Sequence, residues 1–258
     1  MQHQALLENY LRQLRLPTFA TNYQSFSQDA ARTDLPYERF LLALCEAEVA
    51  SREAHRVERA IAQAKFPVIK ELSTFDFSAT PNIPKQRVLE LAQGGYLAKA
   101  ETVILIGNPG LGKTHIATGL ALAACKQGKR VRFYGVMSLV NDLLSAQKDL
   151  RLSRFMAHIG KLDLLVLDEV GFIPFGKDSA QLLFQLCSDL YERVSIIVTT
   201  NLRFGDWNSI FGDERMTAAL LDRLTHKASI LEFVGESYRF RQRLQAEQQG
   251  TETKAATS

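Results

Sequence analysis

The most distinctive chemistry in this 258-residue chain lies in a glycine-rich segment, residues 107–114. It fits the pattern of a phosphate-binding loop, in which glycines let successive backbone N–H groups surround phosphate oxygens. In such a loop Lys113 neutralises the β- and γ-phosphates, and the hydroxyl of Thr114 can bind Mg²⁺. The alternative is a chance glycine-rich turn. The residues expected to hold a nucleotide are Gly107, Asn108, Pro109, Gly110, Leu111, Gly112, Lys113, Thr114 and His115.

A pair of carboxylates supplies the second half of such a site. Asp168 and Glu169 follow the apolar run 164–167, which is typical of a buried strand. An Asp at the end of a strand can reach the Mg²⁺ of a bound nucleotide, so Thr114 and Asp168 are the expected metal ligands. The adjacent Glu can orient and deprotonate an attacking water. The structural alternative is a pair of helix-capping acids.

Two further side chains could assist hydrolysis. Asn201 follows the apolar run 196–200 and could reach the γ-phosphate and the water, although Asn is also an ordinary turn residue. Arg223 and Arg215 lie on one face of a helical stretch and could stabilise transition-state charge on a neighbouring subunit's nucleotide, or simply form intrahelical salt bridges. The expected catalytic residues are Glu169, Asn201, Arg223 and Lys113.

The positive charge is concentrated in one segment. The whole chain has a net charge of +3, but residues 126–161 carry eight Lys or Arg against two Asp. A local basic excess favours a phosphate-backbone partner, and a solvated face is the alternative.

Composition excludes several classes of protein. No apolar run approaches the roughly 20 residues of a membrane span, and the first residues lack the layout of a signal peptide, so a cytoplasmic location is expected. The three Cys and five His are scattered, which argues against disulfides and against a zinc site.

The elements that position these residues fall into two parts. Helical spacing predicts helices over 4–16, closed by Pro17, over 18–32 and over 34–65. We therefore expect a small helical domain over 1–66 and a second domain over 67–249. The latter opens with a linker and a helix over 85–93, and the small polar residues 250–258 favour a disordered tail.

Strand and helix patterns alternate through the second part. The expected strands are 102–106, 130–134, 163–167, 194–199 and 229–233, and the expected helices between them are 113–127, 136–147, 151–160, 179–192 and 214–226. This alternation predicts an α/β fold with a five-stranded parallel sheet covered by helices on both faces.

The combined motifs resemble a known family, the AAA+ ATPases of the IstB/DnaC type, and within it the IstB-like helpers of insertion-sequence transposition. The resemblance covers roughly residues 5–245. Besides the loop at 107–114, it rests on the segments 11–17, 75–77, 168–172, 199–201 and 222–224. It implies a P-loop AAA+ domain, Mg²⁺-dependent hydrolysis of ATP, a homo-oligomer with composite ATP sites, duplex DNA as ligand and the transposase of the same element as partner.

The resemblance also implies individual roles. Asp168 matches the Walker-B acid, Glu169 the catalytic base, Asn201 sensor 1 and Arg223 an arginine finger that acts in trans. Too few residues follow the last strand for a C-terminal helical lid, so we expect none, and Arg239 could partly replace the sensor-2 Arg.

Two helices expected at 136–147 and 151–160 occupy the place where initiator-like AAA+ proteins carry an inserted helix that lines a DNA channel. Lys148, Arg151 and Arg154 fall at that place, so the resemblance implies that these three residues contact DNA phosphates, largely independently of sequence. The nearest alternative is a DnaC-like replicative helicase loader, which would favour single-stranded DNA. A small-molecule kinase and a nucleotide-gated interaction module with negligible turnover are further alternatives.

Overall fold

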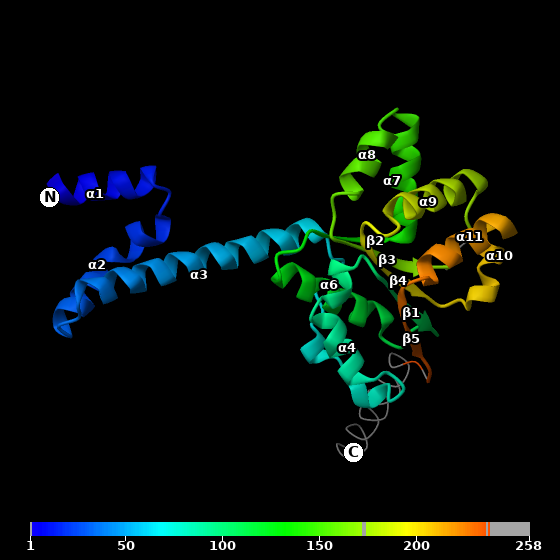
Figure 1. Cartoon of the computed structure of the whole chain (residues 1–258), viewed down its shortest axis with the longest axis horizontal. Helices are drawn as coiled ribbons and strands as arrows, with labels where there is room; N and C mark the ends of the chain where they lie inside the picture. The colour runs from blue at the N-terminus through cyan, green and yellow to red at the C-terminus, as the bar shows by residue number, and fades with distance from the viewer. Residues whose placement is uncertain (1, 172–173, 236, 238–258) are drawn as a thin grey trace, which may run out of the picture. The chain divides into compact units, whose positions relative to one another are not determined.

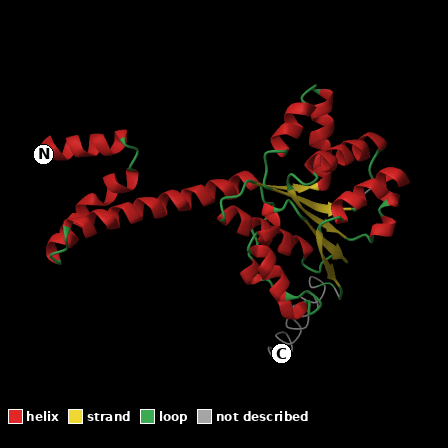
Figure 2. Ribbon diagram, viewed as in Figure 1, coloured by secondary structure: helices red, strands yellow, loops and turns green. Residues whose placement is uncertain are grey.

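The computed structural model describes residues 2–171, 174–235 and 237, and Figures 1 and 2 show how their helices and strands are arranged. Contacts divide the chain into two compact units, residues 1–59 and 60–258. The sequence patterns place the boundary a few residues later, after residue 66. The end of the long third helix, at Ala64, belongs to the hydrophobic core of the second unit.

The first unit consists of helices α1 (Gln2–Gln13), α2 (Pro17–Arg32) and most of α3 (Tyr37–Ala64). The sequence placed the end of the first helix at Pro17, but α1 stops at Gln13 and Pro17 lies in the first turn of α2. A proline is tolerated there because the first N–H groups of a helix have no intrahelical acceptor.

A buried carboxylate joins the helices of the first unit. Glu48 is 4 % exposed and accepts hydrogen bonds from the backbone N–H of Thr18 at 2.9 Å and from Nε of Arg52 at 2.7 Å. Burial acts to raise the pKa of Glu48, but the hydrogen bonds to Arg52 and Thr18 outweigh it and leave that pKa below its ordinary value. The ionised carboxylate therefore stabilises this unit.

The second unit opens with a linker and short helices. Two 3₁₀ turns, η1 (Leu72–Thr74) and η2 (Phe77–Ala79), precede helix α4 (Lys85–Ala92), which agrees with the predicted helix over 85–93. A further short helix, α5 (Gly95–Ala98), follows and was not expected from the sequence.

A five-stranded parallel sheet forms the centre of this unit (Figure 2). Its strands are β1 (Thr102–Gly107), β2 (Val131–Gly135), β3 (Leu164–Val170), β4 (Ser195–Thr200) and β5 (Ala228–Phe233). The strand order is β2-β3-β4-β1-β5, and every pairing is parallel. The predicted fold class is thereby confirmed.

Helices cover both faces of the sheet (Figure 1). One face packs against α6 (Lys113–Lys126) and α4. The other packs against α7 (Val136–Lys148), α8 (Leu152–Ile159), α9 (Lys177–Leu190), α10 (Asn208–Phe211) and α11 (Glu214–Thr225). Alternate strand residues divide between these cores, because successive side chains of a strand point to opposite faces. Leu164 and Val166 join the core on the α6 face, whereas Leu165 and Leu167 join the other.

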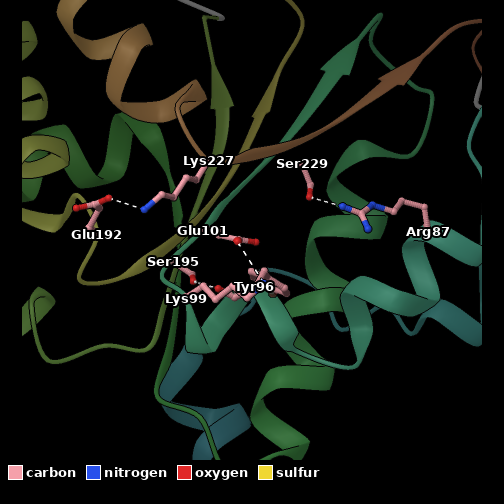
Figure 3. A network of polar contacts seen from close by, with 8 residues as sticks. All are labelled: Arg87, Tyr96, Lys99, Glu101, Glu192, Ser195, Lys227 and Ser229. Carbon is pink, nitrogen blue, oxygen red and sulfur yellow. Dashed lines mark hydrogen bonds and ion pairs between the residues drawn. The ribbon is translucent and has the colours of Figure 1, made fainter.

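Polar contacts gather at the edge of the sheet where the strands begin (Figure 3). The pairs in this network are Lys227 with Glu192 at 2.8 Å, Arg87 with Ser229 at 2.9 Å, Ser195 with the carbonyl oxygen of Tyr96 at 3.1 Å, and Lys99 with Glu101 at 3.9 Å. The bonds of Arg87 and Tyr96 connect α4 and α5 to the starts of β5 and β4, whereas the opposite edge carries the carboxyl ends of the strands.

Three expectations fall on residues that the structure does not describe. The predicted lack of a helical lid, the role of Arg239 and the predicted tail 250–258 all concern the chain beyond residue 237. Within the described residues, no helix combines the length and the apolar character needed to cross a membrane.

Candidate nucleotide-binding site

A cleft of about 600 Å³ opens at the carboxyl ends of β1, β3 and β4. Such a cleft is the usual ligand position in an open parallel sheet. Three segments of the second unit line it. They are the glycine-rich loop and the start of α6 (109–115), the strand ends (Glu169, Thr199, Thr200 and Asn201), and the linker (Lys70, Thr74, Phe75, Asp76, Ala79 and Thr80).

The backbone of the glycine-rich loop has a positive φ, which favours glycine, at Gly107, Gly110 and Gly112. Gly107 has φ +147°, and a Cβ there would lie 2.1 Å from the carbonyl oxygen of Phe233. Gly112 has φ +91°, and a Cβ there would lie 2.6 Å from Cε2 of Phe75. Because α6 begins at the next residue, the loop presents its N–H groups together with a helix N-terminus, an arrangement that favours anions.

The side chain of Lys113 folds over this loop. Its Nζ donates to the carbonyl oxygen of Gly107 at 2.6 Å and to that of Asn108 at 2.8 Å. The ammonium group is therefore held within the loop that would surround a phosphate. These two bonds also stiffen the loop, because they join the first turn of α6 to Gly107 and Asn108, the first two residues of the loop.

The structure brings Asp168 and Thr114 together. The Oγ1 atom of Thr114 donates to Oδ1 of Asp168 at 3.0 Å, although the two residues are 54 positions apart. Alternation along β3 explains the contact, since Asp168 follows Leu164 and Val166 on the face that α6 covers. Asp168 is 7 % exposed.

A magnesium ion would find suitable ligands here. Mg²⁺ prefers oxygen ligands and is held by one or two protein groups together with phosphate oxygens and water. One hydroxyl and one carboxylate fit that requirement. Within the described residues there is no cluster of three or more His, Cys, Asp or Glu that could hold a metal by protein ligands alone.

Glu169 lies at an irregular point of the sheet. The pairing of β3 with β4 shifts register between Leu167 and Val170, and Glu169 has φ +62°. Its backbone N–H donates to Oγ1 of Thr199 at 2.9 Å. The side chain is exposed and lines the cleft, as does half-buried Asn201 from the adjacent strand. Two predicted catalytic residues thus share the cleft with Lys113.

His115 contacts the linker. Its Nε2 lies 2.8 Å from the carbonyl oxygen of Glu71 and 3.3 Å from Oγ1 of Thr74. The ring of Phe75 packs edge-on against that of His115, with centroids 5.2 Å apart. His115 therefore attaches the linker to α6, in addition to lining the cleft.

The linker forms a wall of the cleft. From the sequence alone, Phe75 and Phe77 could pack either on a nucleotide base or against the sheet. Phe75 packs against Gly112 and His115, and Phe77 joins the core of the second unit. The cleft is also lined by Lys70, Thr74, Asp76, Ala79 and Thr80. The segment lacks helical or strand periodicity, so only its aromatic residues gave a signal in the sequence.

Arg223 lies away from this cleft. Its guanidinium group stacks over the ring of Phe184 at 5.1 Å, and its Nη1 donates to the carbonyl oxygen of Ala219 at 2.9 Å. It borders a small cavity together with Tyr191 and Lys227, at the edge where the strands begin. A role for Arg223 in hydrolysis would therefore concern a nucleotide bound to another subunit.

The three basic residues expected to contact DNA lie around the turn between α7 and α8. Lys148 ends α7, Arg151 precedes α8 and Arg154 lies within α8, and all three are exposed. Arg151 forms an ion pair with Asp149. These residues are not among those that line the cleft.

The sequence matches a family model over most of its length. The model described as IstB-like ATP binding protein matches residues 9–246. An insertion sequence ATP-binding protein of Sinorhizobium fredii is 41 % identical over 244 residues, which cover 94 % of this chain and 82 % of the relative. The insertion sequence IS21 ATP-binding protein of Pseudomonas aeruginosa is 37 % identical over 93 % of this chain and 91 % of its own length.

Solved structures share the fold. The DnaC helicase loader matches with a TM-score of 0.50 at 19 % identity, over 58 % of this chain and 88 % of that one. AMPPCP-bound DnaA from Aquifex aeolicus matches with a TM-score of 0.54 at 20 % identity, over 68 % of this chain and 55 % of that one. These similarities show that the chain shares its fold with these proteins. On the family match and the identity to its relatives, this chain belongs to the IstB-like ATP-binding protein family.

Proposed function

We propose that this protein is a Mg²⁺-dependent ATPase that assembles on duplex DNA and assists a transposase in DNA transposition. The observation that carries the ATPase part is the hydrogen bond between Thr114 and Asp168 beneath the phosphate-binding loop. It brings the two expected metal ligands to one place, and Thr114 lines the same cleft as Lys113 and Glu169.

In this proposal each side chain has a separate task. Lys113 neutralises charge on the β- and γ-phosphates, and Thr114 with Asp168 holds Mg²⁺. The bound Mg²⁺ would offset the negative charge that develops on the phosphate oxygens. Glu169 accepts the proton of the attacking water, while Asn201 orients that water from the next strand.

The position of Arg223 supports the assembly of this protein into an oligomer. It lies at the opposite edge of the sheet from its own chain's cleft, so it would complete the site of a neighbouring subunit. ATP bound between subunits would then couple nucleotide binding to oligomerisation. An arginine that acts in this way contributes about 10³–10⁵-fold to turnover in related phosphoryl-transfer systems.

The relatives' names support the connection with transposition, because they are ATP-binding proteins of insertion sequences. The exposed basic residues around the α7–α8 turn support contacts with the DNA backbone. Phosphate contacts carry no base information, so binding would depend on salt and little on sequence. The transposase would then be recruited to the DNA-bound oligomer.

The first test measures ATPase rate and sedimentation with and without duplex DNA. Lys113→Ala should lose nucleotide binding, and Arg223→Ala should bind ATP but turn it over slowly. Mixing Arg223→Ala with Glu169→Gln should restore part of the turnover, because some composite sites then hold an intact Glu169 and an intact Arg223. A mixture that remains inactive would contradict the action of Arg223 between subunits.

A second test addresses the DNA. Replacing Lys148, Arg151 and Arg154 by Ala should weaken duplex binding. It should also make the slope of log affinity against log salt concentration shallower, by an amount that corresponds to the loss of up to about three phosphate contacts. Lys99→Ala, at the edge where the strands begin, is the matched control. Unchanged binding by the triple variant would exclude this surface. A preference for single-stranded DNA would favour a helicase loader, and transfer of labelled phosphate to a metabolite would favour a kinase.

A further inference from the structure

A buried hydroxyl on β4 contacts both acidic residues of the site. Thr199 is 1 % exposed, and its Oγ1 donates to Oδ1 of Asp168 at 2.6 Å. The same Oγ1 accepts the backbone N–H of Glu169 at 2.9 Å. A hydroxyl has one donor and two acceptor positions, so a single threonine can make both bonds at once. Valine has the same shape but can make neither.

The backbone of Glu169 depends on such a partner. A non-glycine residue at φ +62° lies in a sparsely populated region, which persists only where the surroundings fix it. The register shift between Leu167 and Val170 interrupts the regular ladder around Glu169. The side chain of Thr199 then serves as the acceptor for its N–H group.

Thr199 also influences the metal side of the proposed site through Asp168. Oδ1 of Asp168 accepts from Thr114 at 3.0 Å and from Thr199 at 2.6 Å, so one helix, α6, and one neighbouring strand, β4, fix this carboxylate. We propose that Thr199 is a positioning residue for ATP hydrolysis, which orients Asp168 and sets the backbone from which Glu169 extends into the cleft. This inference rests on the ATPase activity proposed above.

The test compares Thr199→Val with Thr199→Ser in the full-length protein. Loss of orientation at a reacting group costs on the order of 10²-fold, so Thr199→Val should turn over ATP roughly 100-fold more slowly. Its affinity for ATP should change by less than about threefold, because Lys113 and the loop are untouched. Thr199→Ser keeps the hydroxyl and should recover most of the rate. Thr102→Val, a buried threonine at the other end of neighbouring β1, controls for the substitution itself.

A double-mutant cycle separates positioning from general damage. If Thr199 acts on turnover mainly through Glu169, Thr199→Val should cost far less in single-turnover rate within a Glu169→Gln background than in the wild type. An equal loss in both backgrounds would overturn the part of this role that acts through Glu169. If Thr199→Val fails to fold, Thr199→Cys replaces it, because a thiol is a weak hydrogen-bond donor.

The outcomes distinguish the inference from the function on which it rests. A wild type without ATPase activity would overturn the proposed function. An active wild type together with a fully active Thr199→Val variant would overturn only the role of Thr199.

Discussion

Replacing Gly112 by Ala tests whether the phosphate-binding loop and the linker pack tightly against each other. Gly112 has φ +91°, and the Phe75 ring fills the space beside its Cα, 2.6 Å from where a Cβ would lie. Phe75 in turn packs edge-on against Phe77 at 4.8 Å and against His115 at 5.2 Å. The new methyl group therefore has to strain the backbone and displace this ring.

Both effects can be given a magnitude. A left-handed backbone costs a non-glycine residue about 1–2 kcal/mol. Each aromatic contact that is lost costs about 0.5–1.5 kcal/mol. If both aromatic contacts of Phe75 are lost, we expect Gly112→Ala to destabilise the second unit by about 2–5 kcal/mol. For a unit of this size that corresponds to a fall in Tm of roughly 4–20 °C. The affinity for ATP should fall as well, because Phe75 lines the cleft.

The assay is thermal unfolding of the full-length protein, following the transition that ATP shifts. Gly95→Ala is the matched control, because Gly95 lies in the first turn of α5 and a Cβ there would meet nothing within 4 Å. It should be neutral or stabilise by up to about 1 kcal/mol. Equal melting temperatures for the two variants would refute the packing of the linker on the loop.

Three further outcomes are expected. Glu169→Gln should abolish most hydrolysis, by about 10²–10⁴-fold, while ATP binding persists in an equilibrium assay. Glu48→Gln should destabilise the first unit by about 1–3 kcal/mol at pH 7 in hydrogen exchange. The stability difference between wild type and variant should shrink as the pH falls below 4.5, the ordinary pKa of Glu. The hydrogen bonds that lower the pKa of Glu48 favour only its ionised form, so their contribution is lost as the carboxylate is protonated. In native protein at pH 8, exposed Cys45 should be alkylated readily, whereas burial raises the pKa of Cys125 to about 11 and of Cys187 to about 12, so both should resist.

Much of the second unit could be predicted from local pattern. Apolar runs such as 164–167 identify buried strands, and the glycine-rich loop lies between a strand and a helix as its motif requires. These signals are local, because they reflect the period of side chains along an element and the backbone freedom of glycine. The five strands and the helices between them are confirmed within a few residues. The functional roles assigned to the site residues stay predictions.

Other features depend on contacts between distant residues. The strand order places β4 between β3 and β1, and only this order brings Thr199 beside Asp168 and Glu169. Pro17 could have ended one helix or begun the next, because its fixed φ and missing N–H suit both positions.

By itself, the sequence determined the phosphate-binding loop, the strand and helix periods and the two acids at the end of β3. Each of these features depends only on residues that are close together in the chain. Only the tertiary structure decided that the linker forms a wall of the cleft, that Arg223 lies at the far edge of the sheet, and that a threonine from β4 joins the acids. Those arrangements arise from packing and hydrogen bonding across the sheet, which no local pattern of residues encodes.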